Sequence, residues 1–406
     1  MAISLKESLV VGFSDFWSRK IRSFVTIFGI ILGTMSIIVV LSLVNGINKK
    51  TLAWMMERGG LSKITIRKNW EYNKETNEKS YLTLKEVDLI RTLLPEAKYF
   101  DPQIRKFLKL VYRDKIFYGN VNGVWPDFTN VEEWNVADGR FINNFDVKES
   151  NDVIVIGSKV KEELFGNKNA IGKFITVHNR RLQIVGVMEE KFLQGDFMND
   201  NALAWMNRKS FIPLSTMIHK VINDDVIERF SIKAPSVEAA PEIRRKLEAI
   251  ILNLRHGEPV LEVESAQEQA ENMEKQSKNF KFIFILVSAI SLLVGGIVIM
   301  NIMLASIQER TREIGIRIAV GARRRDIFTQ FLVQTVLVTS IGGIVGVIAG
   351  LSILQIVSKY LGFGLIAGVP MILIALIVSA GVGLIFGISP AIKASKLNPV
   401  DALRYE

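Results

Sequence analysis

The sequence contains no cysteine and only three histidines in 406 residues. Without cysteine, the chain has neither a disulfide framework nor a thiolate metal site. The histidines, His178, His219 and His256, are dispersed and form no HExxH pair, so they give no zinc-binding pattern. The GxSxG motif of the α/β-hydrolases is also missing. We therefore expect a non-catalytic chain with no catalytic residues, cofactor ligands or metal ligands.

One glycine-rich segment, residues 166–174 (GNKNAIGKF), superficially resembles a phosphate-binding loop. A phosphate loop follows the pattern GxxxxGK and continues with Ser or Thr, which holds magnesium. Here five residues lie between Gly166 and Gly172, and Phe174 follows the lysine. We interpret the segment as a turn before a strand.

Acidic and basic residues are absent from four long stretches, residues 24–47, 282–307, 327–358 and 360–392. A helix needs about 20 apolar residues to cross the bilayer core, and each stretch is longer than that. The net charge of +10 would suit a nucleic-acid-binding protein. The four apolar stretches nevertheless exclude a soluble DNA-binding protein. We predict four transmembrane helices, the first kept as a signal anchor because it exceeds the length of a cleavable signal.

Basic residues gather beside the ends of these stretches. They are frequent in residues 1–23, 308–326 and 393–406, whereas the hairpin between the last two stretches has only Lys359. Because short cytoplasmic segments carry the excess of Lys and Arg, we expect both termini in the cytoplasm. The long segment 48–281 then lies outside.

The predicted fold class is an α-helical integral membrane protein with a large α+β extracytoplasmic domain inserted between transmembrane helices 1 and 2. The predicted segments are a cytoplasmic N-terminal amphipathic segment (1–23), transmembrane helix 1 (24–47), the extracytoplasmic domain (48–281), transmembrane helix 2 (282–307), a cytoplasmic coupling loop (308–326), transmembrane helix 3 (327–358), an outer turn (359–369), transmembrane helix 4 (370–392) and a cytoplasmic tail (393–406).

The outer domain has the composition of a mixed α and β structure. Runs rich in β-branched residues and bounded by Gly, Asn or Asp predict strands, at residues 61–67, 104–112, 116–124, 152–156, 174–177, 182–187 and 260–263. One helix is predicted from the N-cap Thr83 to Leu94, with Glu86 completing a capping box, and another over 237–255. The polar segment 265–279 favours a helical stalk, with an irregular linker as the alternative.

Glycines recur at intervals of four in three of the spans, including Gly383 and Gly387 in the fourth, and we expect helix packing at those of the first and third. They are Gly29 and Gly33 in the first, and Gly342, Gly346 and Gly350 in the third. This spacing lets helices approach closely, either within the chain or across a dimer. No span contains Asp, Glu, Lys or Arg, which disfavours an ion channel or a proton-coupled pump.

The loop at 308–326, QERTREIGIRIAVGARRRD, predicts a short basic helix in which Glu313 and Arg317 are four residues apart. One interpretation is an interfacial helix that anchors the chain on the cytoplasmic side. The other is a docking helix that receives force from a cytosolic protein. The charge pattern does not separate the two.

Residues 309–323 (ERTREIGIRIAVGAR) resemble the signature of MacB-type ABC transporter permeases, within the wider FtsX-like permease family. Further segments resemble the same family in the same order: 22–33 (RSFVTIFGIILG), 153–187 (VIVIGSKVKEELFGNKNAIGKFITV to IVGV) and 390–406 (PAIKASKLNPVDALRYE). The resemblance implies a dimer of permeases, identical or paralogous, in the bacterial cytoplasmic (inner) membrane, driven by a P-loop ABC ATPase that binds ATP and Mg.

The resemblance also implies how the parts work. The outer domain would comprise a membrane-proximal subdomain (48–113 plus 208–281) and an inserted one (114–207), and ATP-driven motion would reshape it for export or efflux. Five loop residues would contact the ATPase: Glu309, Arg310, Glu313, Ile314 and Arg317. Since only a short segment precedes the first span, we expect the ATPase on a separate chain.

Two other functions are compatible with the sequence. Within the superfamily, the same motion could release lipoproteins or regulate cell-wall hydrolases. In a different class, the chain could be a membrane-anchored receptor that works without an ATPase. The sequence identifies no substrate, and an exporter of this kind could work with or without a periplasmic membrane-fusion adaptor.

Overall fold

The computed structural model describes residues 20–72, 81–194, 200–361, 365 and 367–403. Most of the predicted N-terminal segment 1–23 lies outside the described residues, as do parts of the predicted outer turn and the end of the tail. The chain forms two compact units. The membrane unit comprises Met1–Asn48 and Gln276–Glu406, and the outer unit comprises Lys49–Lys275.

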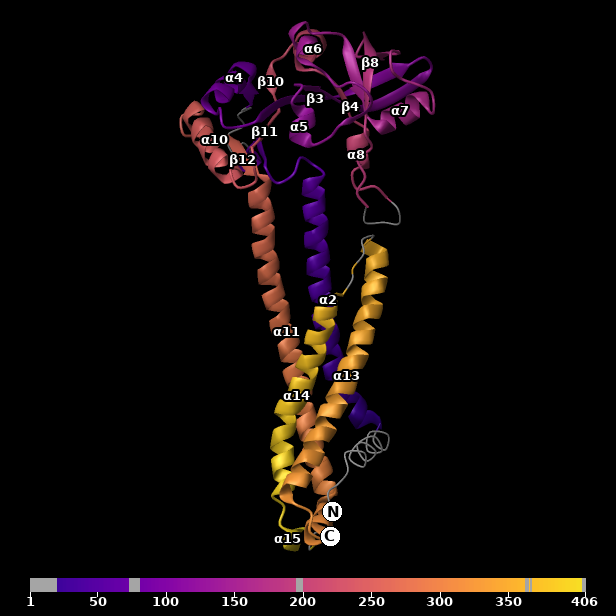
Figure 1. Cartoon of the computed structure of the whole chain (residues 1–406), viewed down its shortest axis with the longest axis vertical. Coiled ribbons are helices and arrows are strands. Elements are labelled where there is room, and N and C mark those ends of the chain that lie inside the picture. The colour runs from indigo at the N-terminus through magenta and orange to yellow at the C-terminus, as the bar shows by residue number, and fades with distance from the viewer. Residues whose placement is uncertain (1–19, 73–80, 195–199, 362–364, 366, 404–406) are drawn as a thin grey trace. The chain divides into compact units, whose positions relative to one another are not determined.

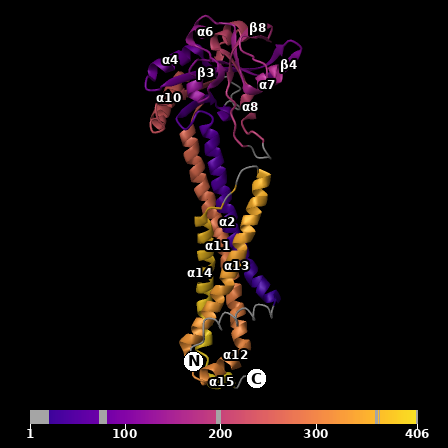
Figure 2. The same cartoon turned by 45° about the vertical axis from the view of Figure 1, so that its right-hand side comes forward.

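Among the described residues, four helices are long and apolar enough to cross a membrane. They are α2 (Lys20–Met56), α11 (Ala266–Glu309), α13 (Arg324–Leu361) and α14 (Val369–Ser395). Two short helices, α12 (Thr311–Ala319) and α15 (Pro399–Leu403), lie together at one end of the bundle in Figures 1 and 2. The helices α2 and α11 extend well beyond the charge-free stretches that predicted them.

Small and hydroxylated residues allow α13 and α14 to pack closely. A Cβ built on Gly387 of α14 would lie 3.0 Å from Cβ of Thr335 on α13, and Gly383 lies in the same way against Thr339. The Thr335 hydroxyl donates to the carbonyl of Phe331 at 2.9 Å. Such a hydroxyl donates its hydrogen bond to a backbone carbonyl of its own helix. It can therefore be buried between spans without leaving an unpaired polar group in the bilayer.

The outer unit is built on a 10-stranded sheet in the order β12-β1-β11-β3-β4-β9-β6-β8-β5, with β7 beside β3 and β8. The strands are β1 (Lys63–Lys68), β3 (Tyr99–Tyr112), β4 (Lys115–Val124), β5 (Val136–Gly139), β6 (Val153–Ile156), β7 (Phe174–Val177), β8 (Arg180–Met188), β9 (Ser210–Pro213), β11 (Arg229–Lys233) and β12 (Leu261–Ser265). Most pairs are antiparallel, but β4 with β9 and β6 with β8 are parallel. Two further strands, β2 (Leu82–Thr83) and β10 (Val226–Ile227), pair separately.

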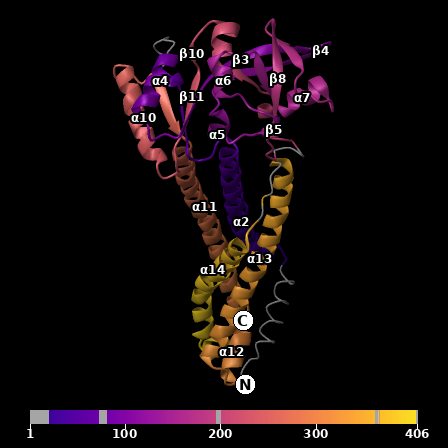
Figure 3. The ribbon, with the colours of Figure 1, turned by 45° about the horizontal axis from the view of Figure 1, so that its top comes forward.

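Helices lie at both ends of this sheet. In Figure 3, α4 (Leu84–Leu93) lies beside α10 (Ala240–Leu254) near β10, and α7 (Ser158–Phe165) lies near β8. The shorter elements are α5 (Phe128–Glu132), α6 (Asn144–Lys148), α8 (Ala204–Asn207), α9 (Leu214–Thr216) and the π-helix η1 (Met217–Ile222). The predicted capping box is confirmed, because Thr83 N donates to Glu86 Oε2 at 2.8 Å and Glu86 N donates to Thr83 Oγ1 at 3.4 Å.

Together the four spans and the inserted outer unit confirm the predicted fold class. Each strand predicted from the sequence is present, but three strands of the large sheet, β5, β9 and β11, and the two-residue strands β2 and β10 were not predicted. The predicted stalk is helical, since α11 begins at Ala266 and runs on into the second span. One sheet passes through both predicted subdomains, and β9, just after residue 207, pairs with β4 and β6.

The alternation along β1 and β11 places apolar and polar residues on opposite faces. Ile64 and Ile66 of β1, with Phe230 and Ile232 of β11, are buried in the main core of the outer unit. A second core gathers around Trp134, and the side chain of Trp54 packs against it. The polar face of β1 and β11 lines the pocket described further below.

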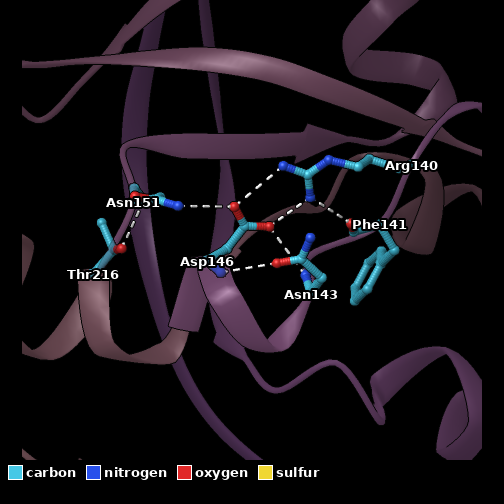
Figure 4. Close-up of polar contacts among 6 residues, drawn as sticks. All are labelled: Arg140, Phe141, Asn143, Asp146, Asn151 and Thr216. Carbon is cyan, nitrogen blue, oxygen red and sulfur yellow. Dashed lines mark hydrogen bonds and ion pairs between the residues drawn. The ribbon is translucent and has the colours of Figure 1, made fainter. Parts of the chain in front are cut away.

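A carboxylate with several donors fixes the loop before α6. Figure 4 shows that Asp146 accepts hydrogen bonds from Arg140 Nη1 (2.5 Å) and Nη2 (3.2 Å), from the backbone of Asn143 (3.0 Å) and from Asn151 Nδ2 (3.1 Å). The Thr216 hydroxyl donates to the carbonyl of Asn151 at 2.8 Å. The network therefore links the loop after β5, helix α6 and helix α9.

Candidate functional site

The helix α12 follows α11 after a single residue, Arg310, which has a non-helical conformation (φ −105°, ψ 14°). The Arg310 amide still donates to the carbonyls of Ser306 and Ile307, and its own carbonyl accepts from the amide of Ile314 at 2.9 Å. The chain thus changes direction at Arg310 while its backbone hydrogen bonds remain satisfied. The predicted site residues Glu309 and Arg310 both lie at this junction.

One face of α12 packs on the membrane unit. Ile314 is buried in the core of this unit, together with Ile327 of α13 and Ala391 of α14. Gly315 is buried beside α15, where a built Cβ would lie 2.5 Å from Cβ of Ala402. The predicted site residue Ile314 therefore holds α12 against the bundle, with only 4% of its surface exposed.

The predicted site residues Glu313 and Arg317 are brought together on the adjacent face of α12. Arg317 Nη2 donates to Glu313 Oε1 at 2.5 Å, one helical turn away. Arg317 Nη1 also donates to Gln330 Oε1 of α13 at 3.2 Å. Gln330 is buried, so Arg317 fixes α12 to the first turns of α13.

Two apolar residues on α12 and at its end are exposed and were not among the predicted contacts. Ile316 is 47% exposed and Val320 is 85% exposed. They are four residues apart and therefore share one face. The sequence indicates this exposure. Residues 314–320 (IGIRIAV) contain two apolar pairs with a spacing of four residues, and a helix packed on a bundle buries only one of the two pairs.

The predicted helix-packing glycines all lie at contacts within the chain. Gly29 lies against Gly295 of α11 and Gly33 against Leu292 of α11. The glycines of α13 lie against α2: Gly342 against Ile30, Gly346 against Thr34 and Gly350 against Ile38. The helix α2 is therefore packed between α11 and α13.

Polar contacts also join α2 to α11. The hydroxyl of Ser277 donates to Oδ1 of Asn48 at 2.5 Å, and the hydroxyls of Ser288 and Ser36 are 3.2 Å apart. Together with the glycine contact, these pairs hold the two helices in register over several turns. Within the bilayer a side-chain hydrogen bond such as that of Ser288 and Ser36 stabilises a helix pair by about 0.6–2 kcal/mol.

Two families match the chain. Residues 23–250 match the MacB-like periplasmic core domain, and residues 285–399 match the FtsX-like permease C-terminal region. Among curated relatives, the "Macrolide export ATP-binding/permease protein MacB" of Bdellovibrio bacteriovorus is 30% identical over 98% of this chain. The chain spans 62% of that relative's length.

Another relative matches end to end. The "Uncharacterized ABC transporter permease YvrN" of Bacillus subtilis is 33% identical over 98% of this chain and 100% of its own length. Among solved structures, the periplasmic region of MacB from Actinobacillus actinomycetemcomitans is 19% identical, with a TM-score of 0.45, and covers 54% of this chain and 95% of that one.

Proposed function

Because the chain belongs to the family of MacB-like permeases with an FtsX-like C-terminal region, we propose that it is the permease subunit of an ABC export system. It would transmit the motion of a cytoplasmic ATPase to the outer unit, with both termini in the cytoplasm and the outer unit outside. A second permease copy would complete the assembly. The ATPase, with its ATP and Mg, would be a separate chain. The full-length match to an ABC transporter permease of Bacillus subtilis supports this arrangement.

The observation that carries the proposal is the continuity of α11. This helix is unbroken over 44 residues and contains no proline, which makes it about 66 Å long at 1.5 Å per residue. Its first residue follows β12, and its last precedes Arg310 and α12. A stiff rod that joins a strand of the outer sheet to a short exposed helix is suited to carrying displacement.

The surface suited to receiving the motion is the outward face of α12. Ile316 and Val320 provide apolar contact area, and Arg312 and Glu313 are exposed beside them. The contacts of Ile314, Gly315 and Arg317 hold the helix firmly on α13 and α15. A displacement of α12 would therefore be passed on to α13 and α15, because these contacts fix α12 to both helices.

The experiment is co-purification of the full-length chain from its native membranes with an ABC ATPase. Val320→Asp places a charge in an exposed apolar position, so we expect loss of the ATPase and of ATP-dependent activity with unchanged thermal unfolding. Arg317→Glu and Glu313→Lys should have the same effect on the ATPase. The matched control is Lys359→Glu, a charge reversal at the other end of α13. Retention of the ATPase and of activity in Val320→Asp and Arg317→Glu would refute the docking role of α12 and favour a receptor that needs no ATPase.

A further inference from the structure

The outer unit contains a polar pocket of about 350 Å³ on the polar face of β1 and β11. Four basic side chains line it, Arg58, Lys63, Arg67 and Arg229, together with one carboxylate, Glu264. Pockets for small ligands typically begin at about 300 Å³. The space is therefore sufficient for a ligand and is much larger than one water molecule requires.

Strand pairing explains why these cations gather. Lys63 and Arg67 lie on the same face of β1, because alternate residues of a strand point to the same side. In β11, Arg229 lies on this face too, since the apolar neighbours Phe230 and Ile232 turn to the core. Arg58 joins them from the turn that follows α2.

Two of the four cations are neutralised within the outer unit. The Lys63 ammonium is 2.5 Å from Glu132 Oε1, and both side chains are 8% exposed. Arg67 pairs with Glu262 at 3.5 Å and also with Glu264. Glu264, the carboxylate that lines the pocket, is therefore already paired with Arg67.

The other two cations, Arg58 and Arg229, have no such partner. Across the described ranges of the chain, no carboxylate lies within 4.0 Å of either guanidinium group, and no acceptor bonds their side-chain N–H groups. The ring centres of Trp54 and Trp205 lie 4.0 Å and 5.5 Å from Arg58 Cζ. Contacts with the π-faces of these rings position the group without bonding its N–H donors.

The surroundings make this excess of positive charge unfavourable. Burial lowers the pKa of Arg58; the carboxylate of Glu132 opposes this, and the charge of Arg229 adds to it. Burial likewise lowers the pKa of Lys209 to about 7, and the charges of Arg229, Lys63 and Arg58 contribute. Desolvated cations are costly unless paired. An anion in the pocket would relieve this cost.

We propose that this pocket binds the phosphate group of an anionic ligand, held between the guanidinium groups of Arg58 and Arg229. Guanidinium forks bind phosphate oxygens in a bidentate manner, which a point charge does not reproduce. A phosphate monoester carries about two negative charges at neutral pH, matching the two unpaired cations. A single carboxylate would neutralise only one of them.

The source of the phosphate is either a soluble phosphate compound or a phospholipid headgroup. Two probes distinguish them. The full-length chain in a phosphate-free neutral detergent is titrated with inorganic phosphate, and separately with bicelles that contain phosphatidic acid, the phospholipid whose headgroup is a phosphate monoester, against bicelles of phosphatidylcholine alone. Binding is followed by calorimetry and by the shift in thermal unfolding temperature. A response to either probe supports the proposal and identifies the source, whereas a response to neither overturns it.

The key variant is Arg229→Gln, with Arg245→Gln as the matched control, because Arg245 is exposed on α10 away from the pocket. We expect Arg229→Gln to weaken binding of the probe that binds the parent chain by about tenfold or more, since the charged hydrogen bonds from Arg229 to the phosphate are lost. Arg245→Gln should bind as the parent does. Arg58→Gln provides a second test if Arg229→Gln does not fold.

Stability without ligand separates a binding role from a structural one. Removing an uncompensated cation should leave the unfolding temperature of ligand-free Arg229→Gln unchanged or higher. A lower unfolding temperature together with an undiminished phosphate response would show that Arg229 is structural and would overturn the proposal. The proposal would also be overturned if sodium chloride at the same ionic strength stabilised the parent chain as much as phosphate does. Screening of the repulsion between the cations would then explain the response without a phosphate site.

Discussion

Gly315 of α12 lies directly against Ala402 of α15, so closely that a Cβ built on Gly315 would be 2.5 Å from Cβ of Ala402. Cβ atoms do not normally approach closer than 3.0 Å. The short C-terminal helix therefore supports α12 at a position where only glycine fits. Since α12 presents the proposed ATPase contact, the pair gives a direct test of whether the position of this helix matters.

We predict that Gly315→Ala displaces α12 from α15 and reduces recovery of the ATPase in co-purification. The additional change Ala402→Gly removes the clashing methyl group, so the double variant Gly315→Ala/Ala402→Gly should recover the ATPase. Ala402→Gly alone serves as the control. If Gly315→Ala retains the ATPase as well as the parent chain does, the position of α12 on α15 is not important for docking.

A second prediction concerns the close approach of α2 and α11. A Cβ on Gly29 would lie 2.9 Å from Cα of Gly295, so Gly29→Val should force the helices apart and destabilise the membrane unit. Overpacking of this kind costs about 1–3 kcal/mol. The measurement is thermal unfolding in detergent, with Gly381→Val as the control, because nothing lies within 4 Å of a Cβ at Gly381. Equal stability of the two variants would contradict the prediction.

A third prediction concerns pH and the carboxylate of Asp146. Burial alone would raise its pKa, but hydrogen bonds from Arg140, Asn143 and Asn151 outweigh this and hold the pKa below its usual value. A carboxyl whose pKa is lowered by folding stabilises the protein above its unfolded pKa of about 3.9, and this contribution is lost as the pH falls through the folded pKa. Stability of the outer unit should therefore fall on acidification below about pH 4–5.

The variant that isolates this effect is Asp146→Asn. It removes the charge and leaves the Arg140 guanidinium without its carboxylate, so we expect a loss of about 1–3 kcal/mol at neutral pH. Its acid-induced destabilisation should also be smaller than that of the parent. Denaturant unfolding of the full-length chain at pH 7 and over a series from pH 5 down to about pH 3 measures both. An identical pH dependence in the variant and the parent would show that Asp146 does not contribute.

Local patterns account for the parts of the fold that the sequence predicts well. The capping box at Thr83 and Glu86 involves residues three apart, and the charge-free spans are continuous stretches. The parallel pairing of β4 with β9 is different, since it joins residues 121–124 to 210–213, and four strands, β5 to β8, lie between them in the chain. No pattern in either short strand specifies that partner.

The candidate sites divide in the same way. The loop signature indicated Glu313 and Arg317, and the structure pairs them. The exposure of Val320 depends on which apolar stripe of α12 packs on the bundle, which the sequence leaves open. Arg58 and Arg229 are single basic residues far apart in the chain. Only the sheet and the turn after α2 bring them to one pocket.

The fourth prediction concerns the buried ion pair of Lys63 and Glu132, each 8% exposed and 2.5 Å apart. Lys63→Met leaves the Glu132 carboxylate buried and uncompensated, and breaking such a pair from one side costs about 3–5 kcal/mol. The double variant Lys63→Met/Glu132→Leu removes both charges and should recover most of this loss, because the Coulomb attraction of a buried pair little more than offsets its desolvation.

The exposed pair of Lys159 and Glu162, 43% and 65% exposed, is the matched control. Lys159→Met should change stability by less than about 1 kcal/mol, as is usual for surface ion pairs. Denaturant unfolding of the parent, Lys63→Met, Glu132→Leu and the double variant measures the coupling between the two buried charges, with Lys159→Met as the control. If Lys63→Met is no more destabilising than Lys159→Met, Glu132 has found another cation, and the nearby charges of Lys209 and Arg229 would be the first to examine. Such a rearrangement would also neutralise part of the charge excess in the pocket, so the same variant should then bind phosphate more weakly.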